Sequence, residues 1–232
     1  MNNTTASNNS EELDKQYYAD LLSGCDTDST LYPDSVSENE KHGIAEHTCT
    51  ADFEEVLKFC KKYNVSANAF FNAVFSFVLA KYTNSTEVLY AAVSNDTNDS
   101  GISKTRVLPI LYRIQDTESF VQLTGDIQTQ LLNGTAHDSY SLAEAVRDHD
   151  LNINAHFIYQ TESFNSSESA LQVYLSVTNK KLQLLGKFKT NTYSEFLIRS
   201  FLTSFDAAVK ECLNVNSLSE ISLITPEAAR TL

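Results

Sequence analysis

The sequence has few of the residues from which common nucleotide-binding loops are built. Its 232 residues include only six glycines and three prolines, and no glycines have the spacing of a G-x-G-x-x-G or Walker-type loop. Nucleotide binding through those motifs is therefore excluded, because each motif needs closely spaced glycines around the phosphates. The five histidines contain no H-x-x-x-H pair, and we expect no metal site.

Cysteine is also scarce. The four cysteines are widely spread along the chain and form no C-x-x-C pair: Cys25, Cys49, Cys60 and Cys212. This spacing predicts reduced thiols rather than a disulfide or zinc framework. Because the spacing identifies no histidine partner for a catalytic thiol, we interpret the cysteines as small core hydrophobes.

Basic residues are outnumbered by acidic ones. The chain has 17 lysines and arginines against 30 aspartates and glutamates, a formal net charge of -13. Such a chain repels phosphate backbones, which excludes nucleic-acid binding. No stretch reaches the roughly 18 apolar residues of a membrane helix, and the polar N-terminus lacks a signal-peptide layout. We therefore expect a cytoplasmic protein that makes no membrane contact.

The apolar residues that are present follow helical spacing in some segments and alternate in others. Helices are predicted over residues 13–22, 52–63, 66–82, 119–132, 142–146 and 193–213. Strands are predicted over residues 87–93, 106–114, 153–159, 173–177 and 182–188. Pro109 indicates that its strand lies at an edge or a bulge. Since helices and strands mix without strict alternation, we expect an α/β fold with a mixed β-sheet and helices packed on it.

Three histidines are weak candidates for chemistry. His137-Asp138 and His149-Asp150 are adjacent pairs in loop-like sequence, where solvated loop histidines are favoured over a catalytic pair. His156 lies in the predicted strand 153–159, where packing against the sheet is favoured over lining a channel.

Several short segments occur in a distinctive order. They are SANAFFNAVFSFVLAKYT (66–83), AVSND (92–96), RVLPIL (106–111), SLAEAVRDHDLN (141–152), AHFIYQ (155–160) and LSEISLITPE (218–227). This order resembles that of nonribosomal peptide synthetase condensation domains, in which "PVSGR", "NTLPLR", "VxFNYQ" and "LSELPLLTPEE" follow a helix of similar pattern. The resemblance is specifically to the C-terminal lobe of these domains.

The resemblance implies a lobe with a chloramphenicol acetyltransferase-like fold and a role in amide-bond formation. The resemblance implies that, in the intact parent, the lobe helps to form the acceptor tunnel for amide-bond formation between carrier-tethered aminoacyl and peptidyl thioesters. The family's catalytic HHxxxDG motif lies in the N-terminal lobe. No histidine in this chain is followed by aspartate four residues later, as expected if the chain begins after that lobe. We expect the chain alone to be inactive.

The resemblance also implies domain limits and partners. Residues 1–42 are expected to be a mostly disordered lead-in or interlobe linker with a short helix near 13–22, residues 43–217 the lobe, and residues 218–232 a linker toward an adenylation domain. The partners are the missing N-terminal lobe, carrier domains and the adenylation domain. No cofactor is bound directly, since phosphopantetheine belongs to the carriers.

Departures from the family pattern fall at positions that shape the tunnel. Arg106 stands where "NTLPLR" has asparagine, and Asn95-Asp96 follow Ser94 in place of "GR". The candidates for residues that face the tunnel or the interlobe cleft are Ser94, Arg106, Asn152 and His156. For Ser94, Arg106 and Asn152, an ordinary surface role is an equal alternative.

Two other functions stay open. The altered tunnel positions favour a non-catalytic scaffold that docks carriers or neighbouring domains. A free-standing acyltransferase of the chloramphenicol acetyltransferase type ranks last, because it would need its own H-x-x-x-D motif. The sequence does not distinguish condensation from epimerisation or cyclisation.

Overall fold

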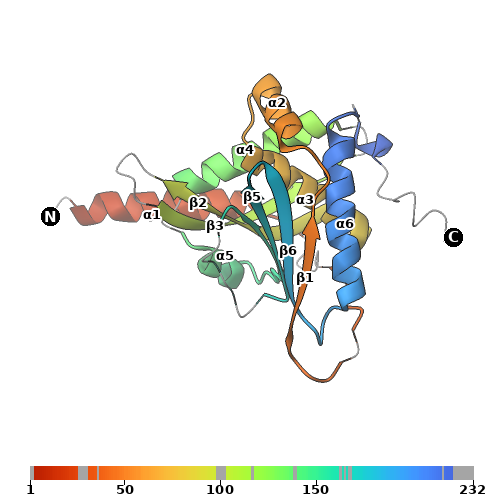
Figure 1. Cartoon of the computed structure of the whole chain (residues 1–232). Coiled ribbons are helices and arrows are strands. Elements are labelled where there is room, and N and C mark those ends of the chain that lie inside the picture. Colours follow the sequence, from red (N-terminus) through yellow and green to blue (C-terminus); the bar gives the residue numbers. More distant parts are fainter. Residues whose placement is uncertain are drawn as a thin grey trace.

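A computed structural model describes residues 3–25, 31–35, 37–97, 103–115, 118–137, 140–161, 164, 166, 169–215 and 217–221. The α-helices within these residues are α1 (Asn3–Leu21), α2 (Phe53–Tyr63), α3 (Ala67–Thr83), α4 (Phe120–Ala136), α5 (Leu142–Asp148) and α6 (Glu195–Cys212) (Figure 1). The strands are β1 (His42–Thr48), β2 (Glu87–Thr97), β3 (Ser103–Arg113), β4 (Ala155–Tyr159), β5 (Leu171–Thr178) and β6 (Lys181–Lys189). A short 3₁₀ helix covers Leu218–Glu220.

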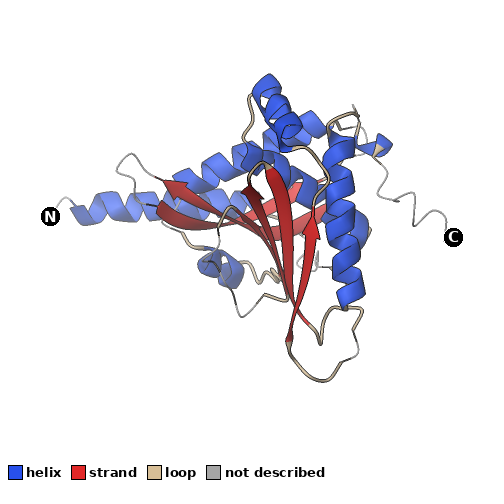
Figure 2. Ribbon diagram, in the orientation of Figure 1, coloured by secondary structure: helices blue, strands red, loops and turns tan. Residues whose placement is uncertain are grey.

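The six strands form one mixed sheet in the order β1-β6-β5-β4-β2-β3. β4 pairs in parallel with β2 and β5, whereas the other neighbouring strands are antiparallel. Helices pack on this sheet (Figure 2), so the predicted α/β fold is confirmed. β3 lies at an edge of the sheet, as Pro109 indicated, because proline has no N–H to donate to a further strand.

The two faces of the sheet carry different cores. α3, α4 and α6 cover one face and build the main core with it. On the opposite face, α1 and α5 pack over β2 and β3, where Tyr18 and Leu22 contact Leu89 and Leu111. This alternation follows from the strand period of two, since Val88 and Tyr90 belong to the main core and Leu89 to the smaller one.

α3 is buried on nearly every side, as its apolar circumference predicted. It begins where Ser66 Oγ accepts a hydrogen bond from the N–H of Ala69 at 3.1 Å, the usual N-cap contact. It ends at Asn84, whose φ of 49° is left-handed. α3 is thus one uninterrupted helix within the main core.

The N-terminal part has more regular structure than the expected lead-in. α1 begins at Asn3 rather than near residue 13, so residues 3–12 are helical and not a disordered lead-in. Leu31 is buried, and its carbonyl accepts a hydrogen bond from Tyr193 Oη at 3.0 Å. β1 was not predicted, because this edge strand buries only Ala45 completely and shows no clear alternation of apolar residues.

The β2–β3 hairpin is longer than predicted. Residues 94–97 and 103–105, which lie outside the predicted strands 87–93 and 106–114, continue the antiparallel register from Ser94–Arg106 to Thr97–Ser103. The backbone ladder forms there without core-facing apolar side chains, so hydrophobic alternation did not mark it. Residues 222–232, which make up most of the expected linker 218–232, lie outside the described residues.

Gly43 provides a test of the β1–β6 packing. It pairs with Phe188, and a Cβ added at Gly43 would collide with the Phe188 ring. Gly43→Ala is therefore expected to lower the free energy of unfolding by about 1–3 kcal/mol, measured by urea denaturation. The control is Gly125→Ala in α4, where an added Cβ meets nothing within 4 Å and helix propensity favours alanine. Equal effects of the two substitutions would contradict this packing.

Candidate functional site

Ser94 and Arg106 face each other across the β2–β3 hairpin. They form a register pair two residues beyond the pair Ala92–Leu108, so all four side chains lie on the face that α3, α4 and α6 cover. Both residues are partly exposed. The two motifs that suggested these residues are thus brought together by the hairpin.

The pair lines a cleft of about 340 Å³. Ser66 and Asn68 from the start of α3, Gln128 from α4 and Leu108 from β3 complete its central part. We call this hollow the Ser94–Arg106 cleft. Its remaining lining residues are Asn95, Leu131, Leu132 and Thr135. The cleft therefore has a polar rim at the α3 N-terminus and an apolar wall of leucines.

The polar rim is held by hydrogen bonds between distant segments. Gln128 Oε1 accepts from the N–H of Ser66 at 2.6 Å, and Gln128 Nε2 donates to the carbonyl of Asn64 at 3.2 Å. These two bonds tie α4 to the turn that precedes α3. They fix the N-cap of α3 relative to the apolar wall.

A buried polar network stands behind Asn68. Asn72 Nδ2 donates to Asn68 Oδ1 at 2.8 Å, and the hydroxyl of Tyr90 lies 3.1 Å from Asn72 Oδ1 and from Ser76 Oγ. Burial raises the pKa of Tyr90 well above its usual value, while its bond to Ser76 works against that shift. The network orients the Asn68 amide at the edge of the cleft.

His156 does not belong to this cleft. It pairs with Ala91 in register, so its side chain lies on the sheet face opposite the main core. There its ring centroid is 5.6 Å from that of Phe164. The side chain is only 7% exposed, and Nδ1 has no hydrogen-bond partner among the described residues. Burial lowers the pKa of His156 to about 4. This histidine is a neutral, packed residue.

Asn152 is exposed in the segment between α5 and β4 and lines no part of the cleft. Of the four candidates, the structure therefore brings together Ser94 and Arg106 only. Sequence reasoning missed Asn68 and Gln128. A polar residue in the first turn of an otherwise apolar helix was a usable signal for Asn68, whereas Gln128 lies on a mixed helix face and gave none.

The interpretation of His137 as a solvated loop histidine is wrong. Its Nδ1 lies 2.8 Å from Asp14 Oδ1, and its ring stacks on Tyr17 with 4.4 Å between the ring centroids. The contact ties α1 to the end of α4. It connects structural elements and is separate from the Ser94–Arg106 cleft.

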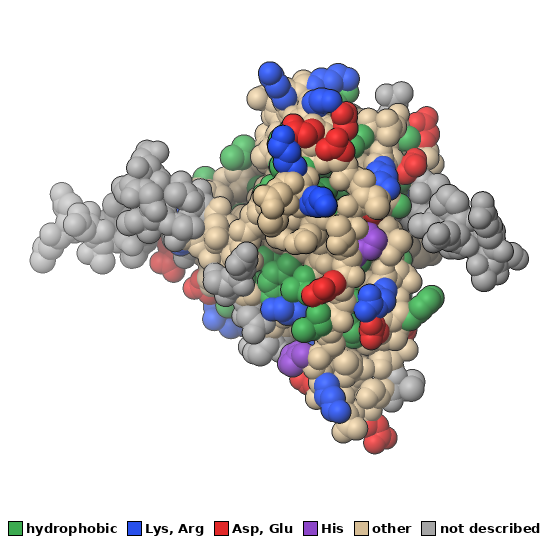
Figure 3. Space-filling view, in the orientation of Figure 1, with side chains coloured by type: hydrophobic (Ala, Val, Ile, Leu, Met, Phe, Trp, Pro, Cys, Tyr) green, Lys and Arg blue, Asp and Glu red, His purple; other side chains and the backbone are tan. Residues whose placement is uncertain are grey.

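A second hollow of about 330 Å³ lies over β1, β5 and β6, on the sheet face away from α6. Glu46, Tyr174 and Lys187 are among its lining residues. Figure 3 shows apolar side chains exposed near the middle of the molecule, with charges of both signs around them.

The mixed sheet with its covering helices, and a cleft beside the β2–β3 hairpin, define an α/β protein. The chain belongs to the condensation domain family, whose model matches residues 2–232. It is similar to malformin synthetase mlfA of Aspergillus homomorphus, with 22% identity over 233 residues, 88% of this chain and 5% of that protein.

Solved structures support the same fold. The chain is similar to the four-domain nonribosomal peptide synthetase AB3403, bound to AMP and glycine, with a TM-score of 0.76 and 10% identity. That match covers 92% of this chain and 20% of the synthetase. The condensation domain of the monacolin K polyketide synthase MokA matches with a TM-score of 0.72 and 15% identity, over 93% of this chain and 60% of that domain.

The chain therefore spans only part of each of these relatives. None of the helices in the described part of the chain is both long and apolar enough to span a bilayer.

Proposed function

We propose that this chain is the C-terminal lobe of a condensation domain and that the Ser94–Arg106 cleft forms part of its acceptor tunnel. One observation carries the proposal: two separate family-like segments, 92–96 and 106–111, meet as a register pair that lines a cleft. The family model matches nearly the whole chain, whereas the chain covers only 60% of the MokA condensation domain. This difference in length supports the assignment of the chain to one lobe.

In this proposal the reaction joins two carrier-tethered substrates. The acceptor amine attacks the donor thioester carbonyl, the amide bond forms, and the donor carrier's thiol leaves with the proton that the amine loses. The phosphopantetheine arms belong to the carrier domains. The other lobe supplies the general base, and an adenylation domain and the carriers complete a cytoplasmic synthetase.

The residues of this chain bind and orient the acceptor. The leucines offer an apolar surface to the arm, while Asn68 and Ser94 offer hydrogen bonds to its amides. A guanidinium near the acceptor amine disfavours its ammonium form. Arg106 thereby keeps more of the amine neutral and nucleophilic than the asparagine of the family pattern would.

The test is Arg106→Ala in the parent protein, purified with an antibody against this chain. With loaded carriers, the rate of amide formation, followed by mass spectrometry of the acceptor carrier, is expected to fall at least about tenfold. Arg113→Ala is the matched control. Arg113 lies on the same strand, 2.6 Å from Glu87 Oε2 and outside the cleft, and its loss is expected to leave the rate within about twofold.

An unchanged rate in Arg106→Ala, with carriers still loaded, would contradict a role for the cleft. A parent that binds carriers but forms no amide even as wild type would favour the docking scaffold instead. The melting temperature of each variant shows whether a lost rate reflects lost folding.

A further inference from the structure

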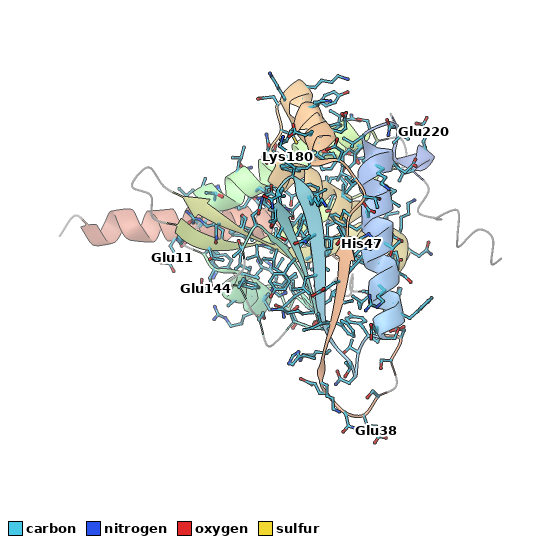
Figure 4. The ribbon with its side chains drawn as sticks, in the orientation of Figure 1. Glu11, Glu38, His47, Glu144, Lys180 and Glu220 are labelled. Atoms are coloured by element: carbon cyan, nitrogen blue, oxygen red, sulfur yellow. The ribbon has the colours of Figure 1, made fainter. Side chains whose placement is uncertain are left out.

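His47, Cys49 and Asp206 converge beside α6. His47 and Cys49 are two residues apart at the end of β1, so their side chains leave the strand on the same side. That side faces α6, because His47 pairs with Leu184 of the main core. Figure 4 shows His47 on β1 next to α6. One His nitrogen, the Cys sulfur and a carboxylate oxygen all lie within 4.8 Å of one another.

The Asp206 carboxylate is held firmly in this position. Oδ1 accepts from the N–H groups of Thr50 and Ala51 at 2.9 and 3.0 Å, and Oδ2 accepts from Thr50 Oγ1 at 2.7 Å. His47 Nε2 lies 3.3 Å from Oδ2. Burial works to raise the pKa of Asp206, but these hydrogen bonds outweigh it and hold the pKa below its usual value. The carboxylate is therefore charged and preoriented.

We propose that His47, Cys49 and Asp206 bind one divalent cation of the zinc class. Imidazole nitrogen, thiolate sulfur and carboxylate oxygen are the three donor types that Zn²⁺ takes in proteins. The hydrogen bonds from Thr50 and Ala51 act as outer-shell contacts that orient the ligating carboxylate. With one thiolate and one carboxylate, the bound dication leaves a neutral cluster, and water fills the fourth position.

Binding exchanges one cation for one proton. A cysteine ligand binds a metal ion as its thiolate. As the cation binds, the thiol proton passes to water and the sulfur forms a bond to the metal. The His47–Asp206 contact opens to admit the ion.

A purely structural role accounts for only part of the cluster. Bracing the turn between β1 and α2 explains the bonds that Thr50 and Ala51 donate to Asp206. It gives Cys49 the role of a small core residue, but it does not use the position of its sulfur beside the His47 ring and the Asp206 carboxylate. A cation uses all three groups and clamps the edge strand β1 to α6.

The test is Co²⁺ titration of the full chain, followed by Zn²⁺ competition against a chromophoric chelator. The wild type is expected to bind one equivalent of Co²⁺ with a thiolate-to-metal absorption band that Zn²⁺ abolishes. Cys49→Ser is expected to lose the band and to weaken Zn²⁺ binding about 100-fold. Cys25→Ser, a thiol at the end of α1 outside the cluster, is the control and keeps both.

Thermal unfolding separates lost ligation from lost folding. Without metal, Cys49→Ser and wild type are expected to melt within a few degrees of each other, and Zn²⁺ raises only the wild-type melting temperature. Absence of a stoichiometric band in the wild type would overturn the proposal. A band or a Zn²⁺ affinity that survives in Cys49→Ser would overturn it equally.

Discussion

Replacing Phe75 with alanine is expected to lower the free energy of unfolding by about 3–5 kcal/mol. Phe75 is fully buried in α3. Its ring centroid lies 4.8 Å from that of Tyr90, 5.0 Å from that of Phe157 and 5.6 Å from that of Phe201. The side chain thus joins α3 to two strands and to α6. Alanine leaves a cavity that these rigid rings do not fill by small movements.

Denaturation in urea measures this loss. The expected effect is a large fraction of the roughly 5–15 kcal/mol that stabilises a typical domain. The matched control is Phe196→Ala, because Phe196 lies in α6 and is 80% exposed. We expect the control to change stability by less than about 0.5 kcal/mol. A Phe75→Ala loss below about 1 kcal/mol would show that the core is not built around this ring.

Acid is expected to destabilise the chain through His156, by about 3 kcal/mol between pH 6.5 and pH 4. Burial lowers the pKa of His156 from 6.5 to about 4 in the folded state. Between these values the unfolded chain binds a proton on His156 that the folded chain does not. The free energy of unfolding therefore decreases as the pH falls through this window. Above the window His156 is neutral in both states, and the folded chain keeps its full stability.

Comparison with His156→Leu isolates this contribution from that of the carboxylates. The difference in unfolding free energy between wild type and His156→Leu is expected to change by about 3 kcal/mol from pH 6.5 to pH 4. His42→Gln, at an exposed position, is the control and is expected to follow the wild-type curve. Parallel curves for wild type and His156→Leu would contradict the buried, neutral state of His156.

The elements that the sequence predicted well are those in which the hydrophobic pattern is strong. α3 has an apolar circumference, and the alternation in the predicted strands 173–177 and 182–188 matches β5 and β6, which pair as a hairpin. α1 and β1 were harder, because α1 is held by a few residues such as Tyr18 and Leu22, and β1 is a polar edge strand. Tertiary contacts, rather than local pattern, stabilise both.

The candidate functional residues also differ in whether the sequence could predict that they lie together. Ser94 and Arg106 could be predicted together, because each belongs to a segment with a family-like pattern and the two strands pair in a hairpin. His47 and Asp206 could not, because they lie 159 residues apart and only the packing of α6 on β1 joins them. Ligand sets assembled across a fold leave no spacing signal in the sequence.

We propose that this chain works as one lobe of a larger peptide-bond-forming enzyme. The most direct measurement is the mass of the native gene product, detected in an extract of the source cells with an antibody against this chain. The proposal predicts a band well above about 100 kDa, as expected for a multidomain synthetase. A single band near the 25.9 kDa of this chain would contradict it.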